Sequence, residues 1–229
     1  MREIEIQTGY LDNPSGSCLI SFGETRVICT ATVEESVPPF LKGTGRGWLT
    51  GEYAMLPGST PGGRKRREIG KRDGRSTEIQ RLIGRSLRAA IDLEQIGEIS
   101  IYIDCDVIQA DGGTRTASIS GGWVALFQAL GTIREKYELP EPDALLTGQL
   151  AAVSVGVVDG EVICDLDYAH DSQAEVDMNI VKLDDNYVEV QGTGEKGVFG
   201  RDRLNELLTA ADEGIAEIFA AQIHALSSL

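Results

Sequence analysis

Long apolar runs, a basic leader and paired cysteines are missing from this sequence. No apolar run approaches the roughly 18 residues of a transmembrane helix, and the N-terminal segment has no basic stretch followed by an apolar one. The four cysteines, Cys18, Cys29, Cys105 and Cys164, lie far apart and form no metal-ligand spacing, so we expect reduced, buried thiols. These absences predict a soluble, cytoplasmic protein without a membrane-spanning helix.

The chain is acidic, but its basic residues are concentrated in one region. Its 229 residues carry a net charge of −15, and 41% of them are hydrophobic, which is typical of a globular protein. Residues 42–88 nevertheless contain 12 of the 21 basic residues and only 4 acids, a local charge of +8. Such a block indicates a polyanion site. Glycine and proline before Arg64-Lys65-Arg66-Arg67 predict a loop there, with a solvated charged surface as the alternative.

Clusters of strand patterns followed by helix patterns occur twice. In the first half, the pattern predicts strands at about 3–8, 17–22, 25–33 and 99–107, helices at 75–92 and 116–137, and a long irregular segment over 38–74. In the second half it predicts strands at about 149–158, 161–167, 174–182 and 187–191, and a helix at 201–226. We therefore expect an α/β (α+β) fold whose two β-rich halves, residues 1–139 and 140–229, pack as one compact domain.

A glycine turn after the buried strand is the first candidate site. The run Asp111-Gly112-Gly113-Thr114-Arg115 separates the strand ending near Val107 from the following helix. A helix N-terminus presents unpaired N–H groups at the positive end of the helix dipole, and an arginine can grip phosphate bidentately. The turn therefore predicts a phosphate site, although glycines also serve plain turns.

Arginines also mark the helix predicted at 75–92. Arg75 stands where a loop enters this helix, and Ser76 or Thr77 could cap it. Further along, Arg81, Arg85 and Arg88 form one stripe opposite the apolar face. The stripe could face RNA, the carboxylates of a neighbouring subunit, or water.

Two aspartates in an acidic string are the third candidate. Asp171 and Asp177 lie six residues apart, an even spacing that would place both on one face of an extended chain if no turn intervened. Two convergent carboxylates suit Mg²⁺, which completes its coordination with water and substrate phosphates. A solvated acidic loop is the alternative, and His170 could be a ligand or base but as a lone histidine is more often neither.

Longer runs around these residues resemble the ribonuclease PH family of phosphate-dependent 3′→5′ exoribonucleases, which trim transfer RNA precursors. The matching segments are Gly47-Trp48 with Glu52–Pro57, Gly74-Arg75 with Glu78–Arg88, Asp104–Thr116, Asp171-Ser172 with Asp177–Asn179, and Glu189–Thr193. The resemblance covers nearly the whole chain from about Ile4. Members usually begin with an Arg-Pro-Asp-Gly-Arg segment, whereas this sequence starts at Met1-Arg2-Glu3-Ile4, and His170 stands where glutamate is common.

The resemblance implies a role for each candidate residue. Arg75, Gly113, Thr114 and Arg115 would bind inorganic phosphate, the co-substrate; Asp171 and Asp177 would be catalytic and hold Mg²⁺ or Mn²⁺; Arg64, Lys65, Arg66 and Arg67 would bind transfer RNA. It also implies a fold similar to domain 2 of ribosomal protein S5, a homo-hexamer built as a trimer of dimers, and a role in transfer and ribosomal RNA processing.

Three other functions are weighed against this one. A metal-dependent hydrolase would use water and need no phosphate site, so Arg75 and Arg115 together argue against it. A non-catalytic RNA-binding subunit of an exosome-like ring commonly lacks part of the catalytic set, whereas this chain retains Asp171 and Asp177 as well. A purely structural ring protein would not explain the basic block.

Overall fold

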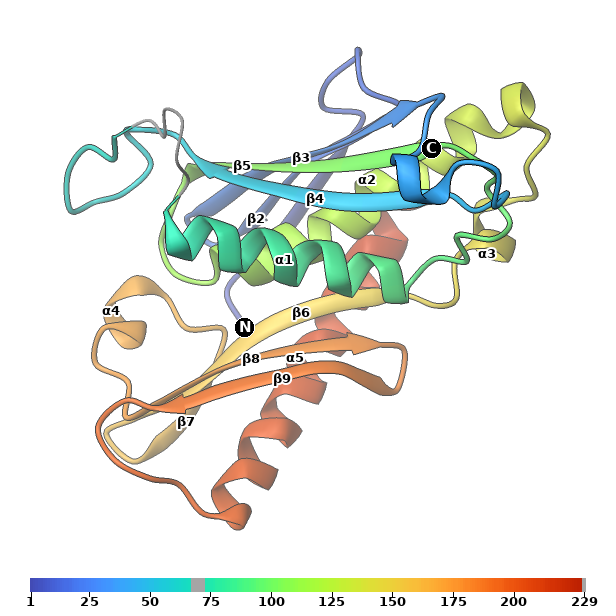
Figure 1. Cartoon of the computed structure of the whole chain (residues 1–229). Helices are drawn as coiled ribbons and strands as arrows, with labels where there is room; N and C mark the ends of the chain where they lie inside the picture. The colour runs from blue at the N-terminus through green and yellow to red at the C-terminus, as the bar shows by residue number, and fades with distance from the viewer. Residues whose placement is uncertain (67–72, 228–229) are drawn as a thin grey trace.

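The computed structural model describes residues 1–66 and 73–227, and its first layer is a five-stranded sheet (Figure 1). The strands are β1 (Ile4–Thr8), β2 (Gly16–Phe22), β3 (Thr25–Glu34), β4 (Trp48–Met55) and β5 (Ser100–Gln109), in the order β1-β2-β3-β5-β4. β4 and β5 run parallel, and the other neighbours are antiparallel. Alternate apolar residues, such as Ile101, Ile103 and Cys105 of β5, are buried, so one face of the sheet forms part of the core.

Two helices cover that face. α1 (Gly74–Ala89) packs on β4 with its predicted apolar stripe, including Ile79, Ile83 and Leu87, fully buried. α2 (Thr114–Tyr137) packs on β2 and β3 and also on β6 (Leu150–Val158) of the second sheet. Because α2 lies between the two sheets, most of its residues are buried, and it is apolar around much of its circumference.

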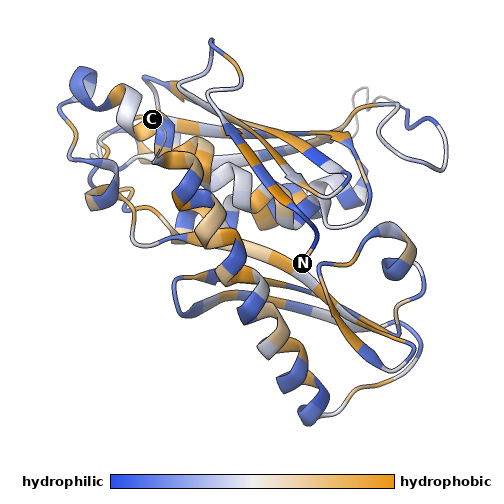
Figure 2. Cartoon of the chain, turned by 180° about the vertical axis from the view of Figure 1, so that it is seen from behind, coloured by the Kyte–Doolittle hydropathy of each residue, from blue (hydrophilic) through white to orange (hydrophobic). Residues whose placement is uncertain are grey.

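The second half repeats the sheet-and-helix arrangement. Its antiparallel sheet has the order β7-β6-β8-β9, with β7 at Glu161–Cys164, β8 at Val176–Leu183 and β9 at Asn186–Gly194. The long helix α5 (Arg201–Leu226) packs on β6, β7 and β1, and Figure 2 shows hydrophobic and hydrophilic segments alternating along it. Short helical turns complete the chain at η1 (Pro39–Leu41), α3 (Pro142–Leu145) and α4 (Tyr168–Asp171).

A large hydrophobic cluster spans both halves of the described chain. It contains Ile20 and Ile103 from the first sheet, Val153 and Ile180 from the second, and Ile215 from α5. The predicted fold class, two β-rich α/β halves packed together, is confirmed. The division after residue 139 stays a prediction.

One predicted segment is wrong. The sequence suggests irregular structure over 38–74, but β4 occupies its centre and pairs in parallel with β5, some fifty residues further along the chain. Gly51 hides the strand pattern at a point where α1 lies close. A Cβ there would be 2.9 Å from Ile83 Cγ2 and 3.1 Å from the Gly84 nitrogen. The glycine is required by packing, although alone it suggests a loop.

Three of the four cysteines are buried as expected. All four cysteines are free thiols; Cys18, Cys29 and Cys105 are buried, and Cys164 is partly buried. Burial raises the pKa of the Cys29 thiol and raises that of Cys164 to about 11, which disfavours reactive thiolates. Among the helices described, none is long and apolar enough to cross a membrane.

Candidate active site

The glycine turn leads directly into the buried helix α2. Gly112 and Gly113 both have positive φ, 75° and 64°, and Gly113 occupies the N-cap position, where it offers no capping side chain. The N–H groups of the first turn are therefore left for an external acceptor. The hydroxyl of Thr114 lies 2.9 Å from the Tyr53 hydroxyl on β4, which fixes the start of the helix against the first sheet.

A cavity of about 550 Å³ opens at this turn, between the two halves of the chain. Every residue predicted to bind phosphate or to carry the catalytic carboxylates lines it. These residues are Arg75, Gly113, Thr114, Arg115, Asp171 and Asp177. Arg64 and Lys65 of the basic run line it as well, so one cavity brings together anion-binding groups, two carboxylates and part of the basic block.

Arg115 is held by residues from two other elements. Its Nη1 donates to Glu78 Oε1 on α1 at 3.1 Å and to Gln191 Oε1 on β9 at 2.9 Å. Gln191 Nε2 also donates to Glu78 Oε1, at 3.0 Å. The sequence contains Glu78 and Gln191 in its matching segments but gives neither a role, because their contact with Arg115 depends on the packing of α1, α2 and β9.

The two aspartates meet by a different route from the one predicted. Asp171 ends the helical turn α4, and Asp177 lies on β8, so a turn does intervene and the extended-chain geometry is wrong. The turn folds back, and both carboxylates still line the cavity. Burial, and to a smaller extent the nearby Asp171 carboxylate, together raise the pKa of Asp177 to about 6. Burial also raises the pKa of Asp171, while Arg75 and Arg115 oppose the shift.

Asn179 and Ser154 are cavity residues that the sequence does not single out. Asn179 follows Asp177 by two positions on β8 and so lies on the same face of the strand. Ser154 on β6 is its cross-strand partner. The alternation of β8 could have revealed Asn179, whereas Ser154 is visible only once the register is known.

Comparison with known proteins identifies the family. Residues 1–130 match domain 1 of the 3′ exoribonuclease family, and residues 148–214 match domain 2. The chain belongs to the 3′ exoribonuclease family. Ribonuclease PH of Corynebacterium diphtheriae is 54% identical over 227 residues, covering 99% of this chain and 93% of the relative. Ribonuclease PH of Bacillus cereus is 52% identical over 235 residues, covering 100% and 94%.

Solved structures of other proteins share the fold at lower identity. The crystal structure of rice (Oryza sativa) Rrp46 gives a TM-score of 0.77 at 16% identity, covering 97% of this chain and 93% of that one. The Archaeoglobus fulgidus exosome with RNA bound to the active site gives 0.76 at 22%, covering 100% and 89%. The full-length similarity to ribonuclease PH supports a phosphorolytic 3′→5′ exoribonuclease over the non-catalytic exosome-like subunit.

Within this member of the 3′ exoribonuclease family, the start of α1 differs from expectation. Arg75 lies in the first turn, but the cap is Asp73, whose Oδ1 accepts from the Ser76 nitrogen at 2.6 Å; neither Ser76 nor Thr77 is the N-cap. Aspartate is as good a cap as serine, and the helix simply begins one residue earlier than predicted.

The arginine stripe on α1 makes contacts within the chain at two of its three positions. Arg85 donates to both carboxylate oxygens of Glu189 on β9. Arg88 packs over the Trp48 ring, 5.5 Å from its centroid, and donates to the Leu49 carbonyl. Arg81 is exposed. Two of the arginines thus tie α1 to neighbouring strands of the same chain, a role that none of the three predicted partners (RNA, a neighbouring subunit or water) includes.

The remaining predicted residues either are not among those that line the cavity or fall outside the described part of the chain. Arg66 is exposed, and Arg67 falls outside the described residues. The His170 ring places Nδ1 2.8 Å from Asp167 Oδ1, and His170 is exposed. This contact stabilises the turn α4 rather than pointing to a ligand or base.

The carboxylate pair fits a partial metal site. In the part of the chain that is described, no cluster of three or more histidine, cysteine, aspartate or glutamate side chains could hold a metal by itself. Asp171 and Asp177 alone match the one or two carboxylates that Mg²⁺ takes when substrate phosphates and water supply its other ligands.

Proposed function

We propose that the chain shortens RNA from its 3′ end by phosphorolysis in the cavity between its two halves. Arg75, Arg115 and the Gly113–Thr114 turn would bind inorganic phosphate, and Asp171 and Asp177 would face the last phosphodiester of the RNA. The observation that carries the proposal is the convergence of all six residues on one cavity, in a chain that is 54% identical to a ribonuclease PH over 93% of that relative.

The reaction exchanges one phosphorus–oxygen bond for another. An oxygen of inorganic phosphate attacks the phosphorus of the terminal linkage, and the bond from that phosphorus to the 3′-oxygen of the preceding nucleotide breaks. The RNA leaves one nucleotide shorter, and the terminal nucleotide leaves as a nucleoside diphosphate. Because a phosphoester is exchanged for a phosphoanhydride, the step is nearly balanced, and nucleoside diphosphates can extend RNA in reverse.

Charge and position account for the role of each group. Phosphoryl transfer depends on orientation and on stabilising charge on the phosphoryl oxygens. The two arginines and the helix N-terminus would orient the phosphate for in-line attack. Mg²⁺ or Mn²⁺ held by Asp171 and Asp177 would neutralise charge on the scissile phosphate when bound. Whether RNA shortening requires inorganic phosphate and releases nucleoside diphosphates tests the proposal.

The broader setting is also a proposal. The substrates would be transfer RNA precursors and other RNA 3′ ends, gripped by Arg64, Lys65, Arg66 and Arg67. The assembly would be a homo-hexamer, a trimer of dimers, acting in the cytoplasm. Support comes from the basic block of residues 42–88 and from the similarity to ribonuclease PH.

Arg66→Ala is expected to weaken transfer RNA binding and to make its salt dependence shallower. Each phosphate contact adds about one counterion to the salt slope, so losing one contact should lower the slope by about 1. Binding is measured across a salt series without inorganic phosphate. Arg203→Ala on α5, where Arg203 pairs with Glu206 at the surface, is the matched control. An unchanged salt slope would show that Arg66 does not contact the RNA backbone, and would contradict the proposed role of the basic run.

Activity is expected to fall as the pH drops through about 6. The pKa of Asp177 is raised to about 6, so this carboxylate becomes protonated there and loses its attraction for a divalent cation. The raised pKa of Asp177 affects stability in the opposite direction: as this carboxylate ionises, the protein gains activity but loses stability. Because the folded-state pKa lies above the unfolded one, ionising Asp177 costs stability as the pH rises from about 4 to above 6. A pH–rate profile at saturating RNA and phosphate checks the activity. A profile flat from pH 8 to pH 5 would contradict the role of Asp177.

A further inference from the structure

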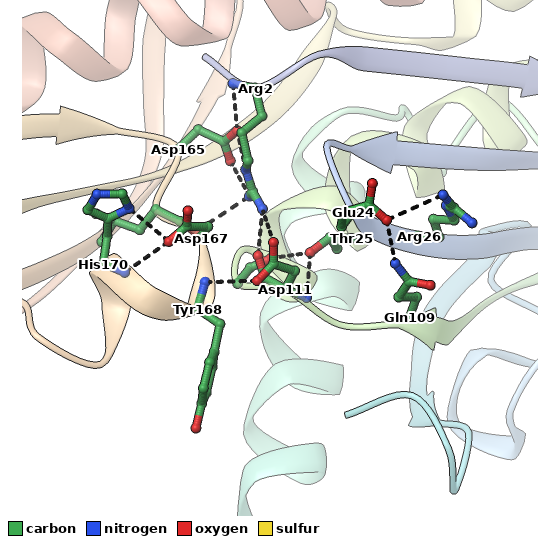
Figure 3. Close-up of polar contacts among 12 residues, drawn as sticks. Arg2, Glu24, Thr25, Arg26, Gln109, Asp111, Asp165, Asp167, Tyr168 and His170 are labelled. Atoms are coloured by element: carbon green, nitrogen blue, oxygen red, sulfur yellow. Dashed lines mark hydrogen bonds and ion pairs between the residues drawn. The ribbon is translucent and has the colours of Figure 1, made fainter. Parts of the chain in front are cut away.

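Arg2, which is far in sequence from most of the cavity residues, forms hydrogen bonds with both sides of the cavity. Arg2 precedes β1, and its guanidinium lies between the glycine turn of the first half and the loop that leaves β7 in the second half (Figure 3). Its Nε and Nη2 donate to Asp165 Oδ2 and Oδ1 at 2.9 and 2.7 Å. Its Nη1 donates to the Asp111 carbonyl at 2.5 Å. One side chain thus binds both walls of the cavity.

Both carboxylate oxygens of Asp165 accept hydrogen bonds from Arg2. The Asp165 side chain is fully buried, and that of Arg2 is 17% exposed. Asp165 also accepts from the Arg2 backbone nitrogen, at 3.2 Å. A buried carboxylate left without its partner is strongly destabilising. The pair is bidentate, a geometry that a guanidinium forms and an ammonium does not.

The glycine turn is held at several successive backbone groups. The buried Thr25 hydroxyl donates to the Gly112 carbonyl at 2.6 Å and accepts from the Asp111 nitrogen at 2.9 Å. Arg2 donates to the Asp111 carbonyl, which lies between these two backbone groups. The Asp111 side chain accepts from the Tyr168 nitrogen at 3.3 Å. These contacts fix the turn whose next residues are proposed to bind phosphate.

The second wall leads to a proposed catalytic carboxylate. Gly112 packs backbone to backbone on this wall, since a Cβ there would lie 2.3 Å from the Leu166 carbonyl oxygen. Two residues beyond Asp165, Asp167 caps α4, and its carbonyl accepts from the Asp171 nitrogen at 2.9 Å. Asp165 thus lies on the same short backbone segment as Asp171, directly before the turn α4.

We propose that Arg2 is a positioning residue for phosphorolysis, which sets the glycine turn at its working distance from Asp171. The inference rests on the proposed function, because it assumes that the turn binds phosphate. Arg2 itself touches neither the phosphate nor the scissile bond in this account. A displacement of about 1 Å between reacting groups can cost up to about 100-fold in rate, so loss of one tether has a measurable effect.

Four variants separate positioning from stability. Arg2→Met keeps length but removes every donor, and Arg2→Lys keeps charge without the fork. Asp165→Asn removes the buried charge alone, and the double variant Arg2→Met/Asp165→Asn removes both charges. The KM for inorganic phosphate, the KM for a 3′-extended transfer RNA, kcat and the melting temperature are measured for each. Arg203→Met is the surface control and should match the unchanged chain.

Arg2→Met is expected to raise the KM for phosphate about tenfold and to leave the KM for RNA within about twofold. Its melting temperature should fall, because Asp165 is left unpaired. The double variant should recover melting temperature but keep the high KM for phosphate, since the Asp111 carbonyl still lacks its donor. Arg2→Lys, expected to fold even if Arg2→Met does not, should also show the raised KM.

Two results would overturn the inference. One is a normal KM for phosphate in Arg2→Met or, if that variant does not fold, in Arg2→Lys. The other is a KM that returns to normal in the double variant together with the melting temperature, which would make Arg2 merely structural. The KM for phosphate of Arg115→Ala is measured in parallel, so that failure of the Arg2 proposal can be told apart from failure of the proposed phosphate site. If Arg115→Ala also uses phosphate normally, the proposed phosphate site is at fault rather than the role of Arg2.

Discussion

Arg115→Ala is expected to abolish phosphate-dependent release of nucleoside diphosphates, lowering the rate by about 1,000-fold or more. Removing one preorganised group that stabilises transition-state charge typically costs about 100- to 1,000-fold, and this arginine would also bind the attacking phosphate. The rate is measured with a 3′-extended transfer RNA at several phosphate concentrations. RNA affinity without phosphate should be nearly unchanged, since Arg115 lies at the glycine turn rather than in the basic loop.

Two comparisons make the Arg115 result specific. Arg115→Lys keeps the charge but not the planar fork, so it should retain partial activity with a raised KM for phosphate. Glu78→Gln removes the carboxylate that contacts Arg115 at 3.1 Å, and should lower the KM for phosphate because a competing anion is gone. A normal rate and a normal KM in Arg115→Ala would show that the attacking group binds elsewhere.

Asp177→Asn is expected to reduce phosphorolysis by at least about 100-fold while leaving the fold intact. The amide has the shape of the carboxylate but carries no charge for a divalent cation. Removal of a partly buried charge whose pKa is raised to about 6 should increase the melting temperature at pH 8. Activity and thermal unfolding are measured on the same preparations at pH 8.

A matched substitution separates this loss from a general effect of removing acid. Asp185→Asn makes the same chemical change at an exposed position in the turn between β8 and β9, and both properties should stay as they were. Wild-type rates in Asp177→Asn at all Mg²⁺ concentrations would exclude this aspartate from the reaction.

The sequence predicts the amphipathic elements of this fold well. α5 occupies Arg201–Leu226 in both prediction and structure, because its apolar residues recur at helical spacing over seven turns. β4 is not predicted, since its pattern is broken by Gly51 and its partner β5 lies far along the chain. A local sequence pattern predicts local structure. Parallel strand pairing and close helix packing depend on residues far apart in the sequence, so a local pattern does not reveal them.

The sequence predicts which residues lie near one another at the candidate site, but it does not predict how the fold brings them together. Asp171 and Asp177 do converge, but by way of α4 and a turn that spacing alone cannot reveal. Arg2 and Asp165 are 163 positions apart, and the contact of Arg115 with Gln191 spans 76, so neither tie leaves a sequence pattern. The roles assigned to the site residues stay predictions.

The most direct test of the account is to identify the products released from a 3′-extended transfer RNA in the presence of Mg²⁺. The purified protein is incubated with and without inorganic phosphate, and the released nucleotides are separated by charge. Arg115→Ala and Asp177→Asn serve as the inactive references. We predict nucleoside diphosphates that appear only when phosphate is present. Nucleoside monophosphates released without phosphate would contradict the account, because water rather than phosphate would then be the attacking group.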